Sequence, residues 1–240
     1  MLNDFPELTH FVEDYHAAFN HKEAVAKYVS FVSLAETEKL IHELKTLLIK
    51  AEVPYENLDL ELNIRFDEEV DARAWLYSTV KMCESQLKRK YHDTITELEM
   101  SATHHKTIGK PRESYTYRLK LEKLYDKLPG YAGERVENLK YLAVLAVYCN
   151  ELEQAERAAR KCLELYLPHA KDLELLATFR WMLAVVLAEN RKFDEAVPYG
   201  MQALVHYIQA HGERSLFAKT CQRDLERMKN KDAGQYLDRG

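Results

Sequence analysis

The chain has 240 residues, of which 47% are apolar and 30% charged, and its formal net charge is −5 at pH 7. This balance is typical of a folded chain and excludes a disordered one, and the length allows one or two domains. Only 7 glycines and 6 prolines occur, and the sequence contains none of the glycine-rich loops that bind phosphates or dinucleotides. Because strands and turns use glycine and proline heavily, the composition predicts an all-α protein.

Targeting signals and cysteines bear on location. The longest apolar runs, 141–149 and 181–188, are far shorter than the roughly 20 residues that cross a bilayer. The first residues have neither the basic flank nor the apolar core of a signal peptide. The 4 cysteines are widely spaced and form no Cys-x-x-Cys pair, which predicts free buried thiols: Cys83, Cys149, Cys162 and Cys221. We expect a cytoplasmic protein without membrane contact.

Charge divides the chain unevenly. Residues 1–90 hold 17 Asp and Glu against 11 Lys and Arg, a balance of −6, whereas residues 91–240 hold 22 against 23, a balance of +1. Phosphate contacts need clustered basic residues, so the acidic region argues against nucleic-acid binding. It favours a basic partner, although a solvated acidic face explains the same charges.

Apolar spacing predicts helices in the first 100 residues. In segment 55–71 the period changes to alternation, which predicts a loop with a short strand. The expected helices cover residues 8–19, 23–33, 36–50 and 72–100.

After residue 100 the pattern changes. Residues 101–112 are polar and contain glycine and proline, which predicts a connection between two domains, 1–100 and 113–230. The tail 231–240 is polar and expected to be frayed. The expected helices of the second domain cover residues 113–128, 134–149, 153–167, 171–189, 193–211 and 214–230.

Two helix pairs of the second domain resemble each other. Each has an early Leu-Ala step, Leu142-Ala143 and Leu183-Ala184, and Ala155 and Ala196 occupy matching positions 41 residues apart. Small residues at such positions let antiparallel helices approach closely, and pairs stack because one pair cannot bury its apolar faces alone. This part resembles tetratricopeptide repeats, although their usual period is about 34 residues. The resemblance implies stacked antiparallel helical hairpins, a solenoid, joined to a small N-terminal helical domain.

The tetratricopeptide resemblance implies a concave groove that binds peptides. Trp181 and Tyr148 are also explained as packing residues within the stack. The groove positions that the resemblance implies are Lys140, Val144, Tyr148, Trp181, Val185 and Glu189.

The N-terminal region has a different resemblance. The opening FPELTHFVEDYHAAF (5–19), the helix ETEKLIHELKTLL (36–48) and the segment FDEEVDARAWLYSTV (66–80) resemble immunity proteins of bacterial contact-dependent growth inhibition systems. Such proteins neutralise a toxin by binding it. An acidic surface speeds association with a basic nuclease toxin. The same carboxylates are also explained as a solvated helix N-terminus. The partner-binding residues that this implies are Asp67, Glu68, Glu69 and Asp71, with Glu56, Asp59 and Glu61 upstream.

Catalytic and metal-binding motifs are absent from the sequence: it has no His-Glu-x-x-His, no nucleophile elbow and no Cys/His cluster at metal spacing. We therefore expect no cofactor and no enzyme activity. The leading hypothesis is a non-enzymatic bacterial immunity protein that occludes a toxin. The alternative is a tetratricopeptide-type adaptor that binds a protein segment in its groove.

Overall fold

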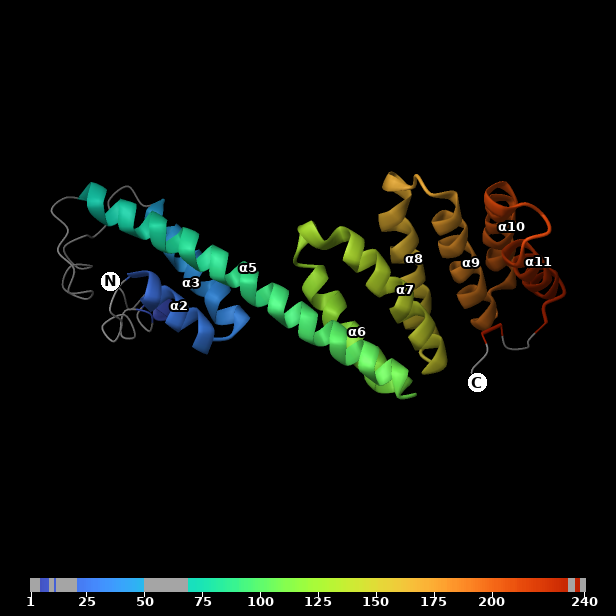
Figure 1. Ribbon diagram of the computed structural model, residues 1–240, viewed down its shortest axis with the longest axis horizontal. Coiled ribbons are helices and arrows are strands. Elements are labelled where there is room, and N and C mark those ends of the chain that lie inside the picture. Colours follow the sequence, from blue (N-terminus) through green and yellow to red (C-terminus); the bar gives the residue numbers. More distant parts are fainter. Residues whose placement is uncertain (1–4, 9–10, 12–20, 50–68, 233–235, 238–240) are drawn as a thin grey trace. The chain divides into compact units, whose positions relative to one another are not determined.

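The computed structural model describes residues 5–8, 11, 21–49, 69–232 and 236–237 (Figure 1). Every regular element within these residues is a helix, so the prediction of an all-α chain is confirmed. The alternating segment 55–71 lies outside the described residues up to position 68, and residues 69–71 begin a long helix. None of the helices in the described part of the chain is long and apolar enough to cross a membrane.

The chain forms two compact units, Met1–Thr94 and Ile95–Gly240. The long helix α5 (Glu69–Thr107) contributes its first part to one unit and its last part to the other. The expected domain boundary near residue 100 therefore falls inside a helix. We describe each unit by itself.

Large apolar side chains form the core of the first unit, where α2 (His21–Phe31), α3 (Leu34–Leu48) and the start of α5 meet. Ser33 and Glu36 begin α3 with a capping box, in which each side chain accepts a hydrogen bond from the other residue's backbone N–H. The fully buried core residues include Phe11, Tyr28, Leu40, Leu44, Leu47 and Leu76.

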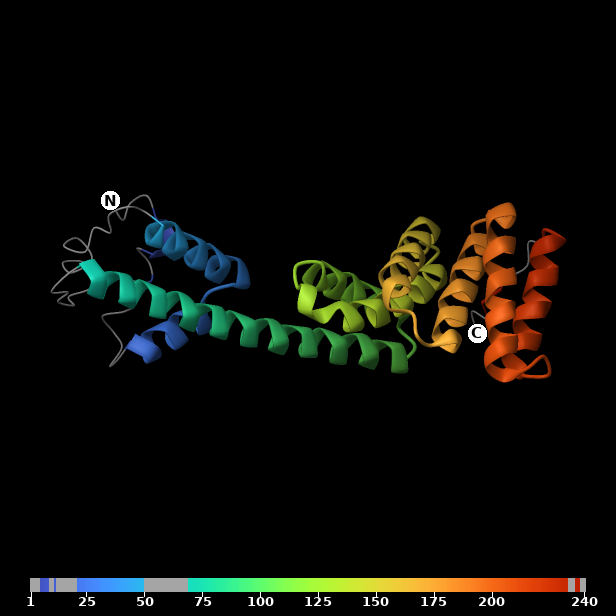
Figure 2. The same ribbon diagram turned by 90° about the horizontal axis from the view of Figure 1, so that it is seen from above.

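Consecutive helices pack side by side in the second unit (Figures 1 and 2). After the end of α5, the elements are α6 (Pro111–Tyr125), η2 (Pro129–Tyr131), α7 (Ala132–Tyr148), α8 (Leu152–Tyr166), η3 (Leu167–His169), α9 (Leu173–Glu189), α10 (Phe193–His211) and α11 (Leu216–Lys229). In addition to consecutive helices, α7 contacts α9, and α9 contacts α11, so alternate helices also touch.

One turn recurs in this unit at a fixed interval. Gly109, Asn150 and Arg191 have positive φ angles of 70°, 62° and 61°, and their positions are 41 residues apart each time. Each follows the last turn of a helix, and the next residue donates its N–H to the carbonyl five positions back, at 2.8 Å in all three cases. This is the Schellman end of a helix. The turn occurs again at Lys231, 40 residues after Arg191.

Small residues also recur at intervals of 41 positions, on both sides of these turns. Ala102, Ala143 and Ala184 are fully buried before the three turns, and Ser114, Ala155 and Ala196 are buried after them. The Ser114 hydroxyl donates to the carbonyl of Ala102 at 2.8 Å, which ties α6 to the end of α5. The 41-residue period therefore includes three helical hairpins, the first of which is formed by α5 and α6.

Two expectations need correction. Residues 101–107, expected to belong to a connection, continue α5, because they form the first half of a hairpin whose turn is at Gly109. The tail, expected to be frayed from residue 231, contains Tyr236, which is only 8% exposed and packs into the core of the second unit.

Candidate functional site

A cavity of about 650 Å³ opens in the second unit. Most of its lining comes from one face of α7 and one face of α9, where the lining residues recur every three or four positions. The two faces are also equivalent, since Lys140, Tyr141 and Val144 are each 41 residues before Trp181, Met182 and Val185. The full lining is Lys106, Gly109, Pro111, Lys140, Tyr141, Val144, Leu145, Tyr148, Thr178, Trp181, Met182, Val185, Val186 and Leu237.

The structure brings together most of the groove positions that the tetratricopeptide resemblance implies. Lys140, Val144, Tyr148, Trp181 and Val185 all line this cavity. The sixth position, Glu189, does not line the cavity but holds the chain segment that includes Leu237. We call this cavity and the Glu189 carboxylate the groove.

The acidic positions predicted in the first unit lie in a part of the chain whose side chains the structure does not describe. Glu56, Asp59, Glu61, Asp67 and Glu68 lie outside the described residues. Glu69 and Asp71 lie in the first turn of α5, and their side chains also lie outside the described part. Their role remains a prediction from the sequence.

Three cations surround one aromatic ring at the groove. The Nζ atoms of Lys106 and Lys140 lie 4.6 and 4.9 Å from the centre of the Tyr141 ring, and the Arg118 guanidinium carbon lies 4.8 Å from it. A ring face attracts a cation through its quadrupole. Lys140 is also paired with Glu137, whereas the Lys106 ammonium has no carboxylate partner among the described residues. This end of the groove therefore carries positive charge.

Arg118 is the most buried of these cations, with 9% of its surface exposed. Its Nη1 donates to the Asn138 side-chain oxygen at 3.4 Å, and Nε has no hydrogen-bond partner in the described structure. Burial lowers the pKa of Arg118, although Glu99 and Tyr141 act in the opposite direction. Arg118 remains charged at neutral pH because an arginine pKa lies so far above 7.

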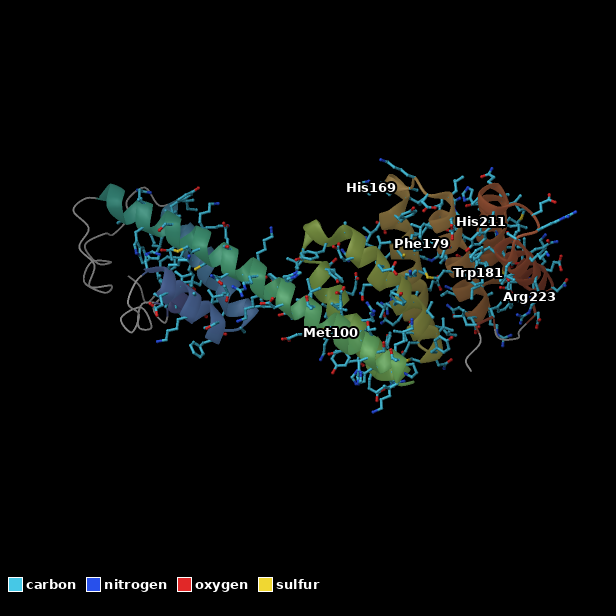
Figure 3. All side chains as sticks on the ribbon, in the orientation of Figure 1. Met100, His169, Phe179, Trp181, His211 and Arg223 are labelled. Atoms are coloured by element: carbon cyan, nitrogen blue, oxygen red, sulfur yellow. The ribbon has the colours of Figure 1, made fainter. Side chains whose placement is uncertain are left out.

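Trp181, which is labelled in Figure 3, packs against other side chains and also lines the wall of the groove. The side chain is half-buried and packs against the cluster around Ala203 and Cys221. Its buried Nε1 lies near the Asp224 carboxyl and lowers the pKa of that group, although the two do not reach hydrogen-bond geometry. Burial outweighs this interaction and raises the pKa of Asp224. The packing interpretation of Trp181 is therefore compatible with its place in the groove.

Tyr148 differs from Trp181 because 38% of its surface is exposed at the last turn of α7. Its ring lines the groove from this accessible position. An exposed aromatic side chain beside an apolar cavity is suited to contact a partner, because it offers a large area with few rotatable bonds.

A feature that sequence analysis missed closes one side of the groove. One carboxylate oxygen of Glu189 accepts hydrogen bonds from the backbone N–H groups of Tyr236 and Leu237, at 2.7 and 3.2 Å. The only signal in the sequence was an adjacent aromatic and leucine in an otherwise polar tail.

The cysteines and potential metal ligands give no second site. Burial raises the pKa of Cys83, Cys162 and Cys221 to about 12, so these thiols stay protonated at neutral pH. Within the described ranges, no three His, Cys, Asp or Glu side chains gather closely enough to hold a metal ion.

Comparison with known proteins adds no assignment: no protein-family model matches the chain, and neither does any curated protein.

Proposed function

We propose that this chain is a non-enzymatic, cytoplasmic binding protein that holds a segment of a partner protein in the groove between α7 and α9. The observation that carries the proposal is the apolar cavity of about 650 Å³ formed by equivalent faces of two neighbouring hairpins. Concave, largely apolar pockets with a few polar groups are the usual ligand sites of proteins. The tetratricopeptide resemblance supports the same function.

The groove chemistry defines the segment that fits. Valine and methionine side chains on the wall favour an aliphatic or aromatic side chain, whose burial contributes about 25 cal/mol for each Å² removed from water. Lys106, Arg118 and Lys140 around Tyr141 favour a carboxylate at the same end. The partner segment therefore combines an apolar side chain with a nearby Asp or Glu.

Selection of displayed random peptides against the full chain tests the proposal. We expect enrichment of segments that pair apolar with acidic residues. The substitution Tyr148→Ala or Lys106→Gln is then expected to lower the affinity of the chain for the selected peptides by about tenfold, equivalent to about 1.4 kcal/mol. Matched controls are Tyr77→Ala, an exposed tyrosine in the first unit, and Lys120→Gln, a lysine that lies over Tyr117 rather than Tyr141. Equal binding by Tyr148→Ala and the parent chain contradicts the proposal.

A second candidate function is toxin neutralisation by the acidic first region. It rests on the −6 balance of residues 1–90 and on the resemblance to immunity proteins. Co-expression with a toxin encoded beside this gene tests it. Charge reversal by Asp67→Lys with Glu69→Lys then abolishes protection, while Tyr148→Ala leaves it intact. Protection that survives charge reversal but fails in Tyr148→Ala assigns the partner to the groove instead.

A further inference from the structure

We propose that Tyr236 and Leu237 form an intramolecular ligand of the groove, which a partner segment must displace. This regulation rests on the proposed function, because it assumes that the groove binds a segment from another protein. The proposal also has a content of its own, namely that the groove recognises a tyrosine followed by a leucine.

The first observation is the contact with Glu189. Two consecutive backbone N–H groups, from Tyr236 and Leu237, point at the same carboxylate oxygen at 2.7 and 3.2 Å. Consecutive N–H groups around one anion form a concavity known as a nest, which binds carboxylates and phosphates. Because backbone atoms make these bonds, any peptide that adopts the same bend can make them too.

Side chains add specificity to this backbone contact. The guanidinium of Arg227, on α11, lies 4.3 Å from the centre of the Tyr236 ring, and the Tyr236 hydroxyl donates to the carbonyl of Asp232 at 2.9 Å. Leu237 lines the groove together with Trp181 and Val185. The site thus accepts an aromatic residue followed by an aliphatic one, in a bend around Glu189.

The repeat register explains why this segment differs from the other hairpins. Tyr236 follows the turn at Lys231 by five residues, as Ala155 follows Asn150 and Ala196 follows Arg191. Ala155 and Ala196 have small side chains, so the second helix of each of those hairpins packs closely against the first. A tyrosine at this position is too large for such an approach, and its ring instead packs into the core of the unit while its backbone contacts α9.

A peptide titration on the full chain tests the proposal. The probe is a labelled synthetic peptide with the sequence of residues 231–240, KDAGQYLDRG. The double variant Tyr236→Ala with Leu237→Ala releases the intramolecular segment, so we expect it to bind the probe about tenfold more tightly than the parent chain does. A probe with both residues replaced by alanine is expected not to bind. Adding Glu189→Gln to the double variant is expected to abolish binding of the original probe.

The controls separate the outcomes. Helix content and thermal unfolding show whether the double variant stays folded. A folded double variant that binds the probe no more tightly than the parent chain overturns the proposal. If that variant unfolds, amide exchange on the parent chain and on Glu189→Gln decides. In the parent chain we expect the Tyr236 and Leu237 amides to be protected from hydrogen exchange. In Glu189→Gln we expect this protection to fall about tenfold. Amides that are unprotected in the parent chain overturn the proposal.

The result is also independent of the partner experiment. Probe binding that requires Glu189 supports the intramolecular ligand even if displayed peptides select nothing. Displayed peptides that bind the parent chain and the double variant equally support the groove but contradict the intramolecular ligand.

Discussion

The first unit fills its core with large side chains, whereas the second unit brings its helices together over small ones. Phe11, Tyr28 and Leu44 are buried at the centre of the first unit. In the second unit Ala143 and Ala184 are fully buried in the helix contacts, and an ideal Cβ on Gly200 would lie 3.1 Å from the Leu225 side chain. The core of the first unit is therefore sensitive to lost volume, and the small-residue helix contacts of the second unit are sensitive to added volume. Small residues at matching positions of successive hairpins keep the helices of the second unit close together.

The largest effect is expected from lost volume in the first unit. Leu44→Ala removes a fully buried side chain and leaves a cavity, so we expect a loss of about 2–5 kcal/mol in the free energy of unfolding. Chemical denaturation monitored by circular dichroism measures it. Ile49→Ala is the control, because that side chain is 82% exposed and its removal is expected to change little. If Leu44→Ala costs as little as the control, then Leu44 does not pack in the core of the first unit.

Added volume in the second unit comes next. Ala184→Leu places three extra carbons where α9 meets Gly200, and such overpacking costs about 1–3 kcal/mol. The same denaturation experiment applies, with the exposed Ala210→Leu on α10 as the matched control. If Ala184→Leu is as stable as the parent chain, close approach through small residues is not what holds these helices.

A buried carboxylate links two hairpins of the second unit. Glu156 on α8 accepts hydrogen bonds from Lys192 at 2.9 Å and Asn190 at 2.8 Å, both at the turn between α9 and α10. Burial raises its pKa, but the hydrogen bonds from Lys192, Asn190 and Arg160 outweigh burial and lower it overall. We expect Glu156→Gln to cost about 1–3 kcal/mol at pH 7, because it weakens charge-assisted bonds.

The pH dependence of this link has a definite sign. A lowered carboxyl pKa stabilises the folded chain above the ordinary value of 4.5, and this stabilisation is lost as the pH falls through the lower folded value. The difference between the parent chain and Glu156→Gln should therefore shrink below about pH 4.5. Glu164→Gln, at a side chain that is 68% exposed, serves as the control. A difference that stays constant with pH contradicts the assignment.

The smallest effect concerns the recurrent turn. Arg191 has a φ of 61°, a backbone conformation that is strained for any residue with a Cβ. Arg191→Gly is therefore expected to raise the free energy of unfolding by about 0.5–1 kcal/mol. Gly109→Ala at the equivalent turn is expected to lower it by about 1 kcal/mol, although nothing lies within 4 Å of the added Cβ. Changes of the same sign at both positions contradict the equivalence of the two turns.

Sequence periodicity predicted the ends of the helices from α7 to α11 to within two residues. For α10 the predicted first and last residues are the observed ones. The first hairpin was missed because its helix end is polar at residues 103–107, where the side chains are mostly exposed. Ala102 and Ser114, each 41 residues before Ala143 and Ala155, were the signal that identifies it. The start of α3 at Leu34 was likewise indicated by the Ser33 and Glu36 capping box.

Most of the groove wall follows from helical spacing, because residues three or four apart share a helix face. The tetratricopeptide resemblance implied that Lys140, Val144 and Tyr148 lie together, and helical spacing agrees with it. The first two are 41 residues before Trp181 and Val185. The cations around Tyr141 could not be predicted, because Arg118 and Lys106 come from other helices.

The sequence by itself determined the all-α class, the hairpin period and one face of each groove helix, because these depend on local spacing and on residue size. The tertiary structure alone decided that Glu189 bonds to Tyr236 and Leu237, 47 and 48 residues away along the chain. It also decided that the first hairpin begins inside α5. Such contacts depend on the path of the chain between distant positions and on which way the stacked helices face, and no local pattern of residues encodes either.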